Sequence, residues 1–131
     1  MSETCYVLDS EGLSRAAQRD RAMARRVVQA HQLGIRVVTS SMTLVEAYHD
    51  KIPYAAWRWT LSRIVVEPVT QDVAEAAITL LKGAGLHGHK YAIDAALAVI
   101  AGRQRGRVTV FTSDEDDMRQ LCAPAVRVQA V

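Results

Sequence analysis

Two acidic residues come directly after runs of apolar residues. Asp9 follows the run 6–8, and Asp114 follows the run 108–111 after two hydroxyl residues. Short runs of this kind, rich in β-branched and aromatic residues, are typical of buried strands. Because ligands collect outside the carboxyl ends of parallel strands, acids at these ends are candidates for chemistry. We therefore expect Asp9 and Asp114 to lie at one edge of a sheet.

Two further acids lie within stretches that carry no other charge. Glu46 lies in the segment 42–47 and Asp94 in the segment 93–101. At helical spacing Asp94 shares a face with apolar residues, which is typical of a face turned toward the core. Burying a carboxylate there costs several kcal/mol unless another group pairs with it. The sequence therefore predicts a partner for this acid.

Each of these acids also has an ordinary structural role open to it. Asp9 could cap the helix that follows it, and Asp114 could do the same for its own helix. Glu46 could be half exposed, and Asp94 could pair with Lys90 one turn earlier. The four acids together favour a shared pocket, because a helix packed over the sheet edge would bring a helical acid beside the strand-end acids.

Carboxylates that share one pocket repel one another. Either some of them take up protons, with raised pKa values, or a hard divalent cation neutralises them. A donor set made only of oxygen atoms prefers Mg²⁺ or Mn²⁺ to Zn²⁺. Such a site suits phosphoryl or phosphodiester transfer, in which the metal positions a water and polarises the phosphate.

The elements that position these acids alternate along the chain. Five short runs are predicted to be strands, at residues 6–8, 35–39, 64–66, 108–111 and 125–129. Six longer segments are predicted to be helices, at residues 14–32, about 40–49, 53–63, 71–82, 90–103 and 114–121. Strands separated by helices pair in parallel through crossovers, so we expect an α/β fold, a three-layer α/β/α sandwich with a central, mainly parallel sheet. No linker or repeat divides the chain, and residues 1–131 are expected to form a single domain.

The acids stand in an ordered series of short motifs. These are Asp9-Ser10 after the first strand, Glu46 at the end of 40–46, Asp94 at the start of 94–98, and 112–117 after the fourth strand. In order and approximate spacing they resemble the PIN-domain nuclease family, and in particular the VapC-type toxin ribonucleases of bacterial toxin–antitoxin pairs. The resemblance covers essentially the full chain.

This resemblance implies a PIN-like fold and an endoribonuclease that depends on Mg²⁺ or Mn²⁺. It implies catalytic and metal-binding roles for Asp9, Glu46, Asp94 and Asp114, with Asp117 as a further metal ligand. The implied reaction is hydrolysis of a phosphodiester by a metal-activated water. The resemblance also implies partners: an RNA substrate, a small cognate antitoxin protein that covers the site, and a second copy of the chain in a homodimer.

Neighbouring residues have supporting roles in the same interpretation. Ser10 and Ser113 match positions where the family places small hydroxyl residues, which we expect to orient the carboxylates through hydrogen bonds. Arg15, Arg19 and Lys90 are expected to contact RNA if they flank the acidic pocket, although each is also an ordinary residue for a solvated surface.

Composition and cysteine content suit a cytoplasmic protein. The chain has 131 residues, half of them hydrophobic, and a net charge of +2, with thirteen of its sixteen basic residues being Arg. Cys5 and Cys122 lie far apart in the sequence, which fits reduced thiols better than a secreted disulfide framework. The longest apolar run, 93–101, is interrupted by Asp94 and is too short to span a bilayer, so we expect no membrane contact.

Other functions remain open from the sequence. A non-catalytic PIN-like module would use an acidic pocket only for binding, and an orphan housekeeping nuclease would act without an antitoxin. A receiver-like phosphoacceptor domain would need an adjacent acidic pair after the first strand and a lysine after the last. The sequence has no acidic pair of adjacent residues after the first strand. It also has no lysine after the last strand, since its lysines are Lys51, Lys82 and Lys90. A flap or repair nuclease of this fold usually carries insertions that 131 residues do not accommodate.

Overall fold

The sheet is the centre of the molecule. The computed structural model describes residues 3–18 and 20–131, and within them five strands form one sheet in the order β3-β2-β1-β4-β5. Every neighbouring pair of strands is parallel. The strands are β1 (Thr4–Leu8), β2 (Arg36–Ser40), β3 (Val65–Glu67), β4 (Arg107–Thr112) and β5 (Arg127–Ala130). All five predicted strands are present, and the sheet is parallel as predicted.

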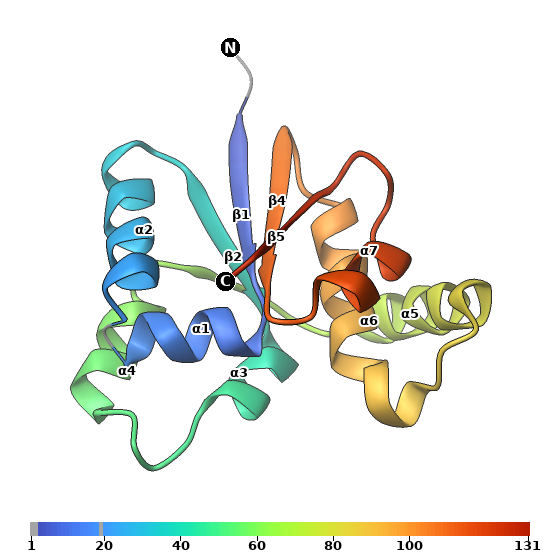
Figure 1. Cartoon of the computed structure of the whole chain (residues 1–131), viewed down its shortest axis with the longest axis horizontal. Coiled ribbons are helices and arrows are strands. Elements are labelled where there is room, and N and C mark those ends of the chain that lie inside the picture. The colour runs from blue at the N-terminus through green and yellow to red at the C-terminus, as the bar shows by residue number, and fades with distance from the viewer. Residues whose placement is uncertain (1–2, 19) are drawn as a thin grey trace.

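Helices cover the sheet on both sides. Those in the described part of the chain are α1 (Ser10–Ala17), α2 (Arg21–Gln32), α3 (Ser41–Ala47), α4 (Tyr54–Leu61), α5 (Gln71–Ala84), α6 (Gly88–Gly102) and α7 (Glu115–Leu121). Helices α1, α2 and α4 lie on one side of the sheet, α5, α6 and α7 lie on the other, and α3 lies at the end of β2 (Figure 1). This is the predicted three-layer α/β/α sandwich.

Each face of the sheet has its own apolar core, because alternate strand residues point to opposite faces. Val7, Val38 and Val110 belong to the core shared with α5, α6 and α7. Leu8 and Phe111 belong to the core shared with α1, α2 and α4. No helix in the described part of the chain combines the length and apolar character needed to cross a membrane.

The predicted helix over residues 14–32 is wrong in its extent, because two helices replace it. The first, α1, begins directly after Asp9, and the second, α2, begins after Asp20, whose Oδ1 accepts a hydrogen bond from the Met23 N–H at 3.2 Å. Each aspartate caps a new helix, so the chain starts helical structure twice in this region. Arg19, one of the predicted RNA contacts, lies outside the described residues.

Strand β4 begins where the chain passes close to the start of β1. Gly106 has a φ of +80°, in the left-handed region, and a Cβ atom added there would overlap the carbonyl oxygen of Glu3. The N–H of Arg107 donates to the same oxygen at 2.8 Å. A side chain at position 106 is therefore excluded both by backbone conformation and by space.

The direction of strand addition reverses at β1. The chain adds β2 and β3 on one side of β1 and then returns through α5 and α6 to add β4 and β5 on the other. In open α/β sheets such a switch point leaves a crevice at the carboxyl ends of the two central strands, where ligands bind. Here the two strands are β1 and β4, and the next residues along the chain include Asp9 and Asp114.

Candidate functional site

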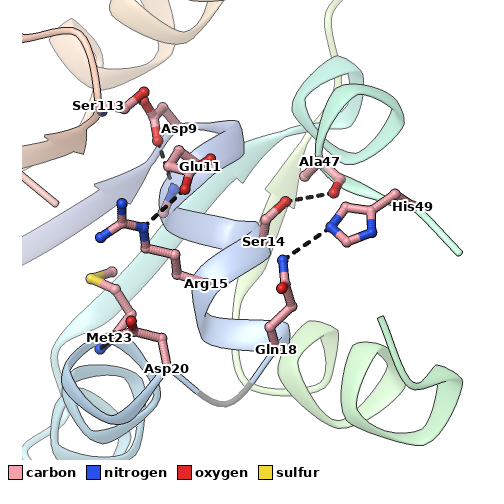
Figure 2. A network of polar contacts seen from close by, with 11 residues as sticks. Asp9, Glu11, Ser14, Arg15, Gln18, Asp20, Met23, Ala47, His49 and Ser113 are labelled. Atoms are coloured by element: carbon pink, nitrogen blue, oxygen red, sulfur yellow. Dashed lines mark hydrogen bonds and ion pairs between the residues drawn. The ribbon is translucent and has the colours of Figure 1, made fainter. Parts of the chain in front are cut away.

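Asp9 joins the ends of the two central strands. Its backbone N–H donates to the carbonyl of Phe111 at 3.1 Å, and its Oδ2 accepts from the Ser113 N–H at 3.0 Å (Figure 2). Its Oδ1 accepts from the Gly12 N–H at 2.8 Å, which caps α1 as the ordinary structural role requires. An ionised carboxylate offers about four acceptor positions, so these two bonds leave room for a further ligand.

Burial and hydrogen bonding act on Asp9 in opposite directions. The residue is only 4% exposed, and this burial raises the pKa of its carboxyl. Hydrogen bonds from Gly12, Thr112 and Ser113 favour the ionised form and offset part of this rise, so the pKa stays above its ordinary value. The result is a carboxyl fixed in orientation by backbone groups of α1 and of the turn after β4.

The carboxyl of Asp94 is influenced by all the other predicted acids. It lies half-buried on α6, and burial is the largest cause of a pKa raised to about 6. The negative charges of the four other predicted acids raise it further; they are Asp9, Glu46, Asp114 and Asp117. Because Coulomb repulsion falls with distance, these four acids lie near enough to Asp94 to act on its carboxyl. We call these five residues the acidic cluster.

Asp114 and Asp117 form a close pair at the start of α7. A hydrogen bond with Asp117 is the main cause that raises the pKa of Asp114. Asp114 occupies the N-cap position of α7, but its side chain accepts no capping hydrogen bond there, so capping does not account for it. Its N–H donates to the Thr112 hydroxyl at 2.9 Å. A neighbouring carboxylate disfavours the ionised form of Asp114, and either a proton or a cation would relieve this repulsion.

Glu46 is an exposed member of the acidic cluster, as Asp114 is, and the ends of α3 are well fixed on either side of it. Ser40 caps the helix, accepting from the Thr43 N–H at 3.0 Å. At the other end, the buried Ser14 hydroxyl of α1 donates to the carbonyl of Ala47 at 2.5 Å (Figure 2). Because Ala47 follows Glu46 directly, this bond sets the distance between α1 and the part of α3 that carries the acid.

The supporting residues differ from expectation in detail. Ser113 reaches Asp9 with its backbone N–H, whereas the sequence suggested its hydroxyl. Ser10 is half-buried and begins α1 directly after Asp9. The roles predicted for the two hydroxyl groups in orienting carboxylates stay predictions.

The two described basic candidates lie near the acidic cluster without neutralising it. Arg15 is paired with Glu11 at 2.9 Å, and the charges of that glutamate, of Asp20 and of Asp9 keep its pKa raised. Lys90 is exposed, and its amino group lies 5.1 Å from the centre of the Tyr91 ring. Hydrogen bonding to that ring's hydroxyl raises the pKa of Lys90 most, and the nearby acids at the start of α7 add to it.

The acidic cluster has no cationic side chain bound to it. Within residues 3–18 and 20–131 the ion pairs are Arg15–Glu11, Arg103–Asp72 and Arg119–Glu115. None of them includes a cluster acid, so the pairing of Asp94 with Lys90 that the sequence left open is not formed. No direct ion pair in the described part of the chain therefore neutralises a cluster acid, although the charge of Lys90 lowers the pKa of Asp114.

The donor chemistry of the acidic cluster fits a hard divalent cation. All five side chains offer carboxylate oxygens, which suit Mg²⁺ or Mn²⁺ rather than Zn²⁺. As the side chains stand, no group of three or more His, Cys, Asp or Glu residues in the described ranges is arranged to hold a metal ion. Binding an ion would therefore draw the cluster carboxylates closer together than they stand in this structure.

Three residues that support the cluster were not identified from the sequence. Gly12 donates to Asp9 at the usual capping spacing, so the cap itself was the available clue. Thr112 accepts the Asp114 N–H, and its position at the end of a strand could have indicated this. Ser14 contacts Ala47 across 33 residues of sequence, and local patterns carry no information on such a contact.

Comparison with known proteins shows the fold. No family model matches the sequence, and no curated protein matches it. Among solved structures, sixteen chains match. One belongs to the crystal structure of VapBC2 from Rickettsia felis bound to a DNA fragment from their promoter. Its TM-score is 0.68 at 14% sequence identity, over 97% of this chain and 98% of that chain. The likeness therefore extends over both whole chains, and the chain has the same PIN-like α/β/α fold.

Proposed function

We propose that this protein is a Mg²⁺- or Mn²⁺-dependent endoribonuclease and the toxin of a toxin–antitoxin pair. The observation that supports the proposal is that Asp9 and Asp114 follow the carboxyl ends of the adjacent strands β1 and β4, while Asp94 lies near enough for these and the other cluster acids to raise its pKa. Unpaired carboxylates at a switch point suit a cation and a phosphate substrate far better than they suit a structural role.

The residues of the site have different proposed roles. Asp9, Glu46, Asp94 and Asp114 would hold the ion, and Asp117 would support Asp114. When bound, such an ion supplies a more acidic water and stabilises charge on the phosphate and on the leaving oxygen. Asp9 provides a fixed carboxylate because backbone N–H groups bind both of its oxygens. Lys90 and Arg15, beside the acids, would bind phosphate groups of the RNA.

The toxin role is supported by two independent lines. The ordered motifs resemble VapC-type toxins, and a structure of the same fold is a protein named VapBC2. On this basis we propose a small antitoxin protein as a partner, a homodimeric toxin and a cytoplasmic site of action. Induced expression in a bacterium should arrest growth, and co-expression of the neighbouring antitoxin gene should restore it. Normal growth of cells that contain the folded protein would contradict the toxin role.

RNA cleavage by the purified protein is the direct test. Cleavage should occur with Mg²⁺ or Mn²⁺ and stop when the metal is chelated. The Asp94→Asn variant should lose at least about 100-fold in rate, because removing a direct ligand exceeds the effect of removing an outer-shell partner. Asp72→Asn is the matched control, since Asp72 is an exposed acid paired with Arg103 outside the cluster.

The outcomes separate the functions that the sequence leaves open. Loss of cleavage in Asp94→Asn, with a normal rate in Asp72→Asn, supports the metal-dependent nuclease. Cleavage that persists in chelator or in the Asp94 variant rejects it. Metal binding by calorimetry without cleavage of any RNA supports the non-catalytic module instead.

A further inference from the structure

A second polar region lies on the sheet, away from the acidic cluster. A cavity of ≈ 460 Å³ is bounded by β1, β4 and β5 together with α2. Its lining includes three arginines, Arg26, Arg107 and Arg127, and neutral polar side chains that include Tyr6, Thr109 and Gln129. The strand register explains the grouping: Tyr6 is paired with Thr109, and Thr109 with Arg127. Residues at such positions point to the same face of a sheet.

The cavity carries positive charge without a matching negative group. Its lining contains no aspartate or glutamate. Arg107 and Arg127 are exposed, and neither forms an ion pair with any residue that the structure describes. Three guanidinium groups around one concave surface attract an anion, and the planar guanidinium fork matches phosphate geometry.

Arg26 supplies the second, independent observation. Its guanidinium carbon lies 4.5 Å from the centre of the Phe111 ring, which fixes the group over β4. Its Nε atom is buried and has no hydrogen-bond partner among the described residues. A buried donor without an acceptor costs about 1–3 kcal/mol, and the packing of Arg26 against Phe111 leaves this donor unsatisfied. Size points the same way, because small-ligand sites typically measure about 300–1,000 Å³.

Strand β4 connects this cavity with the acidic cluster. Phe111 lines the cavity, and its carbonyl accepts the Asp9 N–H at 3.1 Å. The next residues along the chain, Thr112 to Asp114, belong to the acidic site. The six residues of β4 span about 20 Å, so the cavity and the cluster are within reach of one short strand of nucleic acid.

We propose that the cavity binds the phosphodiester backbone of RNA and holds the strand across the acidic cluster. This inference rests on the proposed function of the cluster, and it assigns the substrate contacts to Arg26, Arg107 and Arg127. The neutral groups of Tyr6, Thr109 and Gln129 provide further hydrogen bonds to phosphate or sugar. Recognition through phosphates carries no sequence information, so the cavity positions RNA without selecting the cut sequence.

The test compares two double variants that remove the same charge. Arg107→Ala with Arg127→Ala changes the cavity, and Arg25→Ala with Arg58→Ala removes two exposed arginines elsewhere. Binding of single-stranded RNA is measured in chelator, which prevents metal-dependent cleavage, at several salt concentrations. The cavity variant should bind roughly 10-fold more weakly, and its salt slope should fall by about 1.4, since each phosphate contact on a single strand contributes about 0.7. The control variant should keep the wild-type slope and affinity.

Cleavage kinetics and a competitor complete the test. With metal present, the cavity variant should show a raised KM and an unchanged kcat. Equal losses in the two double variants, or no loss in either, would overturn the cavity assignment. Polyglutamate peptide should bind at least 10-fold more weakly than RNA of equal charge, and equal binding would assign the cavity to acidic protein instead. Absence of cleavage, with RNA binding still lost only in the cavity variant, would reject the proposed nuclease and leave the cavity assignment standing.

Discussion

Asp94 and Asp9 show how differently two carboxyl groups are treated in one site. Both are removed from water, yet only Asp9 receives hydrogen bonds that compensate its charge. Asp94 lies among four acids, and burial and repulsion together raise its pKa to about 6. In the metal-free protein, the fold therefore clearly disfavours the ionised form of Asp94.

This opposition predicts a pH-dependent stability for the metal-free protein. The folded pKa of Asp94, about 6, lies above the ordinary value of 3.8 for an aspartate, so the native state binds more protons than the unfolded state between pH 4 and 6. Stability should therefore fall as pH rises through that window. The loss is complete above the folded pKa and amounts to roughly 2–3 kcal/mol, at 1.36 kcal/mol for each pH unit.

Urea unfolding in chelator measures the effect. Asp94→Asn should be more stable than wild type at pH 8 and should lose most of that advantage at pH 4. Asp72→Asn, the exposed control, should differ from wild type by less than about 1 kcal/mol at both values, because exposed ion pairs contribute little. An Asp94 variant that is less stable than wild type at pH 8 would show that its carboxylate is compensated.

Gly106 is a second position at which the surroundings determine the residue type. Gly106→Ala should destabilise the protein by about 2–4 kcal/mol, because it combines a positive φ with overlap against Glu3. Gly34→Ala is the matched control: Gly34 has φ +72°, but an added Cβ meets nothing within 4 Å. Its cost should be about 1–2 kcal/mol, from backbone strain alone. Equal costs for the two variants in thermal unfolding would contradict the role of the close approach.

At the level of elements, the sequence predicted the sheet better than the helix boundaries. Short runs rich in β-branched residues located the strands, because strands buried on both faces of a parallel sheet consist of continuous apolar residues. The helix over 14–32 was drawn as one element because alanine and arginine suit a helix throughout, and propensity does not show where a cap interrupts it. Placement of the acids at one edge followed from the topology. Contacts between distant segments, such as Ser14 with Ala47, could not follow from local pattern.

The contact between α1 and α3 is open to a direct test. Ser14→Ala leaves the buried carbonyl of Ala47 without its donor, which should cost about 1–3 kcal/mol of stability. It should also weaken Mg²⁺ binding, because the end of α3 beside Glu46 is released. Ser62→Ala removes an exposed hydroxyl that donates to Trp59, and it serves as the control with little effect on either quantity. Equal metal affinities in the two variants, measured by calorimetry, would show that the α1–α3 contact does not influence metal binding.

At the level of the whole molecule, the site draws on β1, α3, α6 and α7 together. An ion bound only by the folded arrangement should stabilise the entire domain. At a free Mg²⁺ concentration 100 times Kd the gain is about 2.7 kcal/mol, or about 10 °C in Tm for a chain of this size. Differential scanning fluorimetry should show this rise for wild type and not for Asp94→Asn. A rise of equal size in the variant would place the ion outside the acidic cluster.

The hydrogen bond from Ser113 to Asp9 joins residues 104 positions apart in the chain. During synthesis Asp9 leaves the ribosome well before Ser113, its partner on the far side of the crevice, has been translated. Emerging N-terminal segments can fold locally, whereas this long-range closure has to wait. If the cluster cuts RNA as proposed, the nascent chain cannot cut the RNA of the translating ribosome before both residues have been made.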